Sequence, residues 1–99
     1  MSKKNCYGII YFVQPAELVG TERYKVGCSS NPSLKRIKTG YKKGTRIINI
    51  FKCEAPFEIE KKIKRAFNDK FKLIAGTEYF EGNEQEMSQL FLDIFHNQD

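Results

Sequence analysis

Two short apolar segments near the start of the chain constrain its fold more than any other feature. Residues 9–13 (Ile-Ile-Tyr-Phe-Val) and residues 24–27 (Tyr-Lys-Val-Gly) are rich in β-branched and aromatic side chains. The pattern predicts strands over residues 7–14 and 23–28, antiparallel because their connection is short. Asn31 and Pro32 then supply a capping residue and a proline at the first helical position. A short helix is therefore expected as far as about Lys38, with Thr39 and Gly40 ending it.

The rest of the chain predicts one more strand and two longer helices. Residues 46–53 have β-branched character, and Pro56 opens a helix that reaches about residue 70. Residues 77–80 form a short extended piece, and residues 83–96 carry an apolar stripe at helical spacing. We expect an α+β fold of order ββαβα plus a C-terminal helix, with a small three-stranded antiparallel sheet flanked by helices.

The charge distribution is strongly segregated. All 17 Lys and Arg residues lie within residues 1–75, which have a net charge of +11, whereas residues 76–99 contain six acidic residues and no Lys or Arg. A basic body favours a polyanion as partner, because each phosphate contact releases counterions. An ordinary solvated surface is the alternative, so charge alone supports nucleic acid only in part.

Length and cysteine content exclude several classes of protein. A chain of 99 residues is predicted to form a single domain, with its motifs within about residues 8–81 and a terminal helix over about 83–96. Three cysteines without CxxC spacing make a disulfide framework or a zinc site improbable. No apolar stretch is long enough for a signal sequence or a membrane span. We expect a soluble intracellular protein without membrane contact.

In this order and spacing, the motifs resemble the GIY-YIG nuclease superfamily. The first motif reads Ile9-Ile10-Tyr11 after Gly8, and Lys25-Val26-Gly27 stands where the family has Tyr-Ile-Gly. A lysine there is similar to a branch found in phages and large DNA viruses. The segment Gly76-Thr77-Glu78-Tyr79-Phe80 resembles the Gly-x-Glu-Trp-Phe ending of that branch. If the protein is viral, its compartment would be the cytoplasm or nucleus of the host.

The resemblance implies catalytic roles for Tyr11 and Lys25. Strand alternation puts Tyr11 on one face of the first strand, and puts Lys25 on the face of the second strand opposite Tyr24. Tyr11 would act as the general base, with the positive charge of Lys25 favouring its deprotonated form. A tyrosine packed in the core is the ordinary alternative for Tyr11. Tyr24 is a register-shifted alternative catalytic residue.

The family's helical arginine corresponds to Arg36. A fixed guanidinium would hold a nonbridging phosphate oxygen as negative charge builds. Lys35 is an adjacent alternative, and is otherwise a nucleic-acid contact. A histidine often follows the family's arginine, but residues 37–40 contain none.

The family's catalytic carboxylate corresponds to Glu60 on the predicted long helix. Glu60 lies beside the apolar stripe of that helix, whereas Glu58 lies away from it. The implied role is to hold one Mg²⁺ or Mn²⁺ ion, which needs a hard oxygen ligand. A surface ion pair with Lys64 is the alternative for Glu60. Glu78 is a second alternative catalytic residue, with a structural role ahead of a catalytic one.

The resemblance and the basic composition together favour a metal-dependent endonuclease acting on DNA. Candidate contacts to the phosphate backbone lie in the loop after the first helix and on one face of the long helix: Lys42, Lys43, Lys61, Lys62 and Arg65. One rival is an inactive nucleic-acid-binding module of the same fold. Another is a protein-interaction domain that uses its acidic C-terminal helix. The sequence leaves the oligomeric state open.

Overall fold

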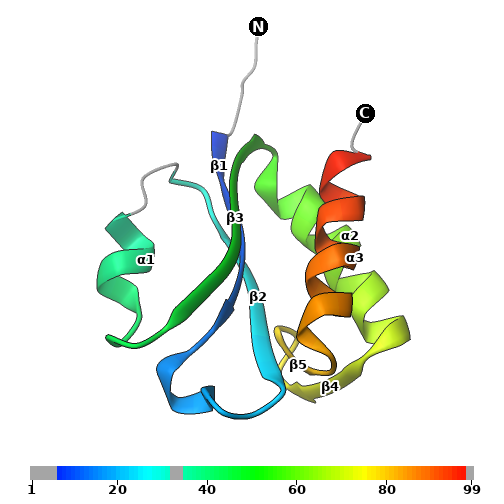
Figure 1. Cartoon of the computed structure of the whole chain (residues 1–99). Helices are drawn as coiled ribbons and strands as arrows, with labels where there is room; N and C mark the ends of the chain where they lie inside the picture. The colour runs from blue at the N-terminus through cyan, green and yellow to red at the C-terminus, as the bar shows by residue number, and fades with distance from the viewer. Residues whose placement is uncertain (1–6, 32–34, 98–99) are drawn as a thin grey trace, which may run out of the picture.

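The computed structural model describes residues 7–31 and 35–97 and contains a five-stranded antiparallel sheet with strand order β3-β1-β2-β5-β4 (Figure 1). Helices lie on both sides of this sheet. The elements in chain order are β1 (Tyr7–Gln14), a short 3-10 turn (Ala16–Leu18), β2 (Arg23–Ser29), α1 (Lys35–Gly40), β3 (Arg46–Glu54), α2 (Pro56–Lys70), β4 (Lys72–Ala75), β5 (Tyr79–Glu81) and α3 (Glu84–His96).

Strand β1 is the centre of the three longest strands. It pairs with β2 on one side and β3 on the other, and all its residues except the first are buried. Its β-branched and aromatic residues suit a strand that is covered on both faces. Tyr11 lies opposite Gly27, and Val13 lies opposite Lys25. Because directly opposed residues point to the same face, Tyr11 and Lys25 project from the same side of the sheet.

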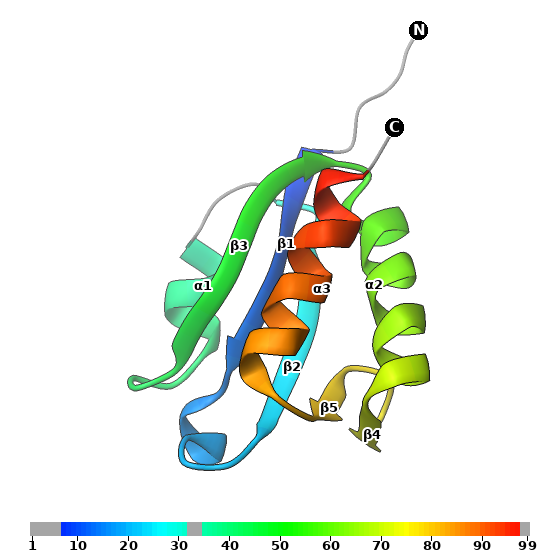
Figure 2. The same ribbon diagram turned by 45° about the vertical axis from the view of Figure 1, so that its right-hand side comes forward.

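The sheet separates two apolar clusters. The larger one joins α2 and α3 to one face, and the smaller one joins Ile37 of α1 to Tyr11 and its neighbours on the other face (Figure 2). Alternation along β1 explains the division, because Ile10 and Phe12 enter the larger cluster while Ile9 and Val13 enter the smaller one.

Helix α2 confirms the predicted boundaries. Ala55 adopts a left-handed conformation with φ of 51°, and Pro56 then occupies the first turn, where a missing N–H costs nothing. The stripe Ile59, Ile63 and Phe67 is buried against the sheet. This burial holds α2 along β2.

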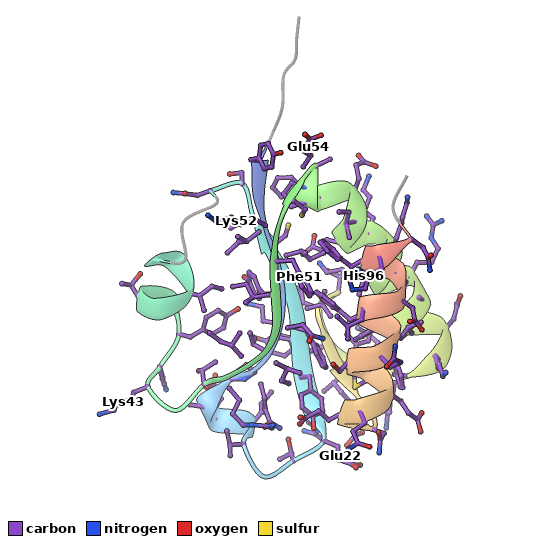
Figure 3. All side chains as sticks on the ribbon, turned by 45° about the horizontal axis from the view of Figure 1, so that its top comes forward. Glu22, Lys43, Phe51, Lys52, Glu54 and His96 are labelled. Atoms are coloured by element: carbon purple, nitrogen blue, oxygen red, sulfur yellow. The ribbon has the colours of Figure 1, made fainter. Side chains whose placement is uncertain are left out.

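The acidic helix α3 packs through its apolar stripe and is anchored at its first turn. Met87 and Phe91 are fully buried, and Phe51 of β3 stacks on Phe95 with ring centroids 4.3 Å apart. Figure 3 shows Phe51 extending from β3 toward the end of α3 that carries His96. At the other end of the helix, the Asn83 side chain accepts a hydrogen bond from the N–H of Glu86. Among the described residues, no helix is both long and apolar enough to cross a membrane.

The α+β class is confirmed, but the strand count was wrong. Two short strands, β4 and β5, extend the sheet beyond β2, where three strands were expected. The predicted extended piece at residues 77–80 is strand β5, shifted to Tyr79–Glu81. Strand β4 has no clean alternation of burial, and it is ordered by pairing with β5 across a bulge.

Two boundaries also differ from the expectation by a few residues. Helix α1 runs through Thr39 and Gly40 instead of ending at Lys38, and β2 includes Ser29. A glycine at a helix end is tolerated because the last turn carries little of the packing. The predicted start of the helix at Pro32 lies outside the described residues.

Candidate functional site

A hollow of about 370 Å³ lies on the α1 side of the sheet. It is lined by Tyr11 from β1, Lys25 from β2, and Thr39, Gly40 and Tyr41 at the end of α1. The two strand residues project into it because the register puts them on the same face. The hollow therefore combines a phenol and an ammonium group from adjacent strands beneath one helix end. It is called the tyrosine–lysine pocket below.

Gly27 determines where the ring of Tyr11 lies. A Cβ atom built on Gly27 would be 2.6 Å from Cε1 and Cζ of Tyr11 and 2.7 Å from its hydroxyl oxygen. The phenol thus rests directly on the backbone of β2, at a point that accepts no side chain. Tyr11 is 4% exposed, so its ring is held by packing while its hydroxyl edge reaches the pocket.

Tyr41 is a pocket residue that sequence reasoning missed. Its hydroxyl donates to the hydroxyl oxygen of Tyr11 at 3.4 Å, and the two rings meet edge to face with centroids 6.1 Å apart. The family resemblance directed attention to residues 37–40, and Tyr41 follows directly after them. Its position in the chain was a usable signal, but its contact with Tyr11 depends on how the loop after α1 folds back.

Lys25 is oriented by aromatic rings. Its ammonium lies 5.1 Å from the ring centroid of Tyr41 and 5.6 Å from that of Tyr79. Such contacts hold a cation without neutralising it. Within residues 7–31 and 35–97, no carboxylate lies at salt-bridge distance from Lys25. The charge is therefore held in place and available to an anion in the pocket.

Glu60 lies away from this pocket, on the α2 side of the sheet. Its carboxylate forms an ion pair with Lys64 one turn later, with N and O 3.2 Å apart. It also accepts a hydrogen bond from Cys28, a residue of β2 that points to the α2 side. Burial, with Glu60 as the second cause, raises the pKa of the Cys28 thiol to about 12, so this cysteine is a neutral hydrogen-bond donor.

Strand β2 separates Glu60 from the tyrosine–lysine pocket. Strand β5 pairs with β2 over Arg23 to Lys25, and α2 packs against β2 on the face of the larger apolar cluster. Glu60 stands beside Cys28, whose chain neighbour Gly27 carries the ring of Tyr11. The described contacts do not link Glu60 directly to Tyr11 or Lys25. The two groups occupy opposite faces of the same short piece of β2.

The alternative residues Tyr24 and Glu78 have structural contacts. Tyr24 enters the larger apolar cluster, and its hydroxyl donates to Glu84 at 3.0 Å. Burial, followed by this bond, raises the pKa of Tyr24. The backbone carbonyl of Glu78 accepts the N–H of Val26 at 3.0 Å and continues the β2–β5 pairing. Tyr24 thus faces away from the tyrosine–lysine pocket.

The predicted basic contacts divide into two groups on opposite sides of the sheet. Lys42 and Lys43 are exposed and line a second hollow of about 280 Å³ that shares Tyr41 with the first. Lys61, Lys62 and Arg65 are exposed on α2. Figure 1 shows α1 and α2 on either side of the sheet. The side chains of Lys35 and Arg36 lie outside the described part of the structure, although both belong to α1.

Around Glu60, the described residues offer one carboxylate as a hard oxygen ligand. In the described part of the chain, no three His, Cys, Asp or Glu side chains gather as a metal cluster. Magnesium can be held by one carboxylate when waters complete its octahedral coordination. Glu60 offers such an oxygen and its side chain is 15% exposed, but its pairing with Lys64 would have to open.

Comparison with known proteins identifies the family. No curated protein and no solved structure shows significant similarity to the chain. The family model of the T5orf172 domain matches residues 8–95, from the glycine before the first motif almost to the end of α3. This domain is found in phage and viral proteins that resemble homing endonucleases, and its fold is related to nuclease folds. The match includes every strand and helix from which the tyrosine–lysine pocket is built, so the chain belongs to the T5orf172 domain family.

Proposed function

We propose that this protein is a GIY-YIG-type endonuclease that hydrolyses phosphodiester bonds in DNA with Mg²⁺ or Mn²⁺. The observation that carries the proposal is the shared pocket of Tyr11 and Lys25, where a phenol oxygen and an ammonium held by aromatic rings lie beneath the end of α1. Membership of the T5orf172 family supports a nuclease-like or DNA-binding role for the domain. The net charge of +5 supports a polyanionic substrate.

The residues of the pocket have complementary roles in this proposal. Tyr11 acts in its deprotonated form and accepts the proton of the attacking water, while the hydroxyl of Tyr41 donates to the Tyr11 oxygen and stabilises the negative charge on it. The water oxygen forms a bond to phosphorus, the bond from phosphorus to the leaving sugar oxygen breaks, and the leaving oxygen takes a proton from solvent. Lys25 holds a nonbridging oxygen of the scissile phosphate, because its ammonium is oriented by two rings and no described carboxylate forms an ion pair with it. The resemblance to the GIY-YIG family assigns the role of a second cation to Arg36, a residue of α1.

Glu60 would hold the metal ion, whose chemistry is to stabilise the developing charge on phosphate oxygens. Its carboxylate lies beside Cys28 on the α2 side of β2, whereas the Tyr11 ring rests on Gly27 on the other face. Lys64 keeps that carboxylate neutralised in the structure described above. Glu60 must therefore exchange its lysine partner for the cation, which predicts weak metal binding.

A binding module without catalysis is the second candidate function. The observation that favours it is the separation of Glu60 from Tyr11 and Lys25 by the sheet, together with the closed Glu60–Lys64 pair. Such a module would retain the basic surface and lose only the chemistry.

The test of the endonuclease is cleavage of supercoiled plasmid and of branched DNA, with and without Mg²⁺ or Mn²⁺. Tyr11→Phe keeps the ring on Gly27 and removes the hydroxyl, and Glu60→Gln keeps the shape of the side chain and removes its charge. Tyr7→Phe and Glu58→Gln are matched controls, because both parent residues are exposed. Thermal unfolding of all four variants checks that the fold is intact.

Cleavage that requires metal, is lost in Tyr11→Phe and Glu60→Gln, and persists in both controls is the expected result. DNA binding with no cleavage of any substrate would overturn the endonuclease and leave the binding module. Absence of binding even at low salt would exclude both, and would point to a protein partner for the acidic helix α3.

A further inference from the structure

A separate groove lies next to the tyrosine–lysine pocket on the same face of the sheet. Its volume is about 230 Å³, and it is lined by Glu17, Leu18, Arg23, Ile74, Ala75 and Tyr79. Arg23 and Lys25 are two residues apart on β2, so their side chains point to the same face. Their Cα atoms are about 7 Å apart. Tyr79 lies directly opposite Lys25 on β5. The groove therefore begins two residues along β2 from Lys25, the residue proposed to hold the phosphate.

Tyr79 connects the groove with the pocket. Its ring lies 5.6 Å from the ammonium of Lys25 and also forms one wall of the groove. The residue is half-buried, and its neighbour Phe80 points the other way into the larger core. Strand alternation thus presents Tyr79 on the pocket side while Phe80 anchors β5.

The lining of the groove suits a planar, mostly apolar group with polar edges. Leu18, Ile74 and Ala75 give it apolar walls beside the aromatic ring of Tyr79. The carboxylate of Glu17 would repel a phosphate, but it can accept hydrogen bonds from the amino group of a base. Arg23 is paired with Glu81 at 3.6 Å and is 46% exposed, so its guanidinium can also reach a backbone phosphate.

We propose that this groove binds an unpaired nucleobase next to the phosphate held at Lys25, with the base stacked on Tyr79. The inference rests on the proposed function, because it takes the tyrosine–lysine pocket as the phosphate position. A base within a duplex has both faces covered by its neighbours, so only a base out of the stack can lie against the ring. The substrate class is therefore nucleic acid with an unpaired nucleotide at the cleavage position, such as a flap or a branch.

The experiment measures stacking directly. Two oligonucleotide duplexes carry the fluorescent base 2-aminopurine, one within a single-stranded flap at the junction and one at a fully paired position. Binding is measured without divalent metal, so that cleavage does not interfere. The fluorescence of the flap base is expected to fall when the protein binds, whereas that of the paired base is expected to stay unchanged.

Three variants separate the groove from the rest of the surface. Tyr79→Leu removes the ring, and Tyr79→Phe retains it. Ala75→Leu narrows the groove from the β4 residue opposite Tyr79 and retains the side chains of Tyr79 and Lys25. Tyr7→Leu is the matched control, because Tyr7 is 51% exposed at the start of β1. Tyr79→Leu and Ala75→Leu should bind the flap substrate about tenfold more weakly and the paired duplex with unchanged affinity.

Each outcome bears on the inference. If Tyr79→Leu and Ala75→Leu weaken both substrates equally, or if the flap base shows no quenching with the parent protein, the groove does not hold a base, although nucleic-acid binding stands. If the parent protein binds neither substrate at low salt, the proposed function fails as well. Retained flap affinity in Tyr79→Phe together with its loss in Tyr79→Leu supports stacking.

Discussion

Single contacts at Gly27 and Tyr41 set the geometry of the tyrosine–lysine pocket. Gly27 leaves space for the Tyr11 ring, and Tyr41 contacts both Tyr11 and Lys25. Sequence reasoning identified Tyr11 and Lys25 through their motifs. It did not identify Tyr41, because the contact of Tyr41 with Tyr11 depends on how the loop after α1 folds back. Two predictions follow from contacts at this scale.

Gly27→Ala should destabilise the protein by about 1 to 3 kcal/mol, because the added methyl group forces the packed Tyr11 ring out of its position. Urea unfolding followed by circular dichroism measures the change. Gly40→Ala is the control, since a Cβ there meets no atom within 4 Å. Equal stability of the Gly27→Ala variant and the parent would mean that the ring does not rest on this backbone.

Tyr41→Phe should slow cleavage about threefold to tenfold with little change in KM, because it removes one hydrogen bond to Tyr11 and keeps the ring under Lys25. Single-turnover kinetics at saturating DNA isolates the chemical step. Tyr7→Phe serves again as the control and should cleave at the parent rate. A change in KM alone would assign Tyr41 to substrate binding instead of proton transfer.

Among the elements, α3 depends on one charged contact at its first turn. Glu84 accepts two hydrogen bonds from Arg46 of β3, each 2.8 Å long, and one from Tyr24. Arg46 also donates to Gln14 at the end of β1 at 2.7 Å. The contact thus ties α3 to three strands. Hydrogen bonds from Arg46, the largest cause, lower the pKa of Glu84.

Glu84→Gln should lower the free energy of unfolding at pH 7 by about 1 kcal/mol, a figure reduced for solvent screening because Arg46 is 45% exposed. Because the pKa of Glu84 is lowered in the folded protein, its carboxylate stabilises the fold fully at a pH above the ordinary pKa of 4.5. This stabilisation is lost as the pH falls through the lowered pKa. The difference between variant and parent should therefore be full at pH 7 and vanish in acid.

Thermal unfolding between pH 2 and pH 7 measures this difference. Glu86→Gln is the matched control on the same turn, because the described part of the chain gives Glu86 no ion pair. A difference that is independent of pH would show that packing, and not charge, holds the first turn of α3.

At the scale of the whole molecule, the fold distributes its basic residues over two sides of the sheet. Lys42 and Lys43 lie on the α1 side with the tyrosine–lysine pocket, whereas Lys61 and Lys62 lie on α2. A DNA duplex bound at the tyrosine–lysine pocket would lie next to Lys42 and Lys43, which are on the same side of the sheet. The apolar stripe of α3 packs on the opposite face, which leaves its acidic residues away from the pocket.

The double variant Lys42→Gln/Lys43→Gln should weaken DNA binding and reduce the slope of log affinity against log salt by about two, since each lost phosphate contact removes about 0.9. Lys61→Gln/Lys62→Gln carries the same change of charge on the other side and should have a smaller effect. Fluorescence anisotropy with a labelled duplex over a series of salt concentrations gives both slopes. A larger loss in the α2 variant would place the DNA across that helix.

The sequence by itself determined the elements with strong periodicity and the faces of their residues. The boundaries of β1 and α2 and the apolar stripe of α3 followed from local patterns, because burial on a strand or helix repeats every two or about 3.6 residues. The same rule put Lys25 and Tyr24 on opposite faces of β2, and the pairing register of β1 with β2 then placed Tyr11 on the Lys25 side. The motifs resemble the GIY-YIG superfamily, whereas the family that the comparison shows is that of the T5orf172 domain.

Only the tertiary structure decided which distant residues meet. The addition of β4 and β5, the placement of Tyr41 and Tyr79 around Lys25, and the tie between Arg46 and Glu84 all join segments far apart in the chain. Glu60 was predicted correctly to lie beside the apolar stripe, yet the side of the sheet that it faces depends on how α2 packs along β2. Local periodicity carries no information about such contacts, because they arise from the packing of whole elements against one another.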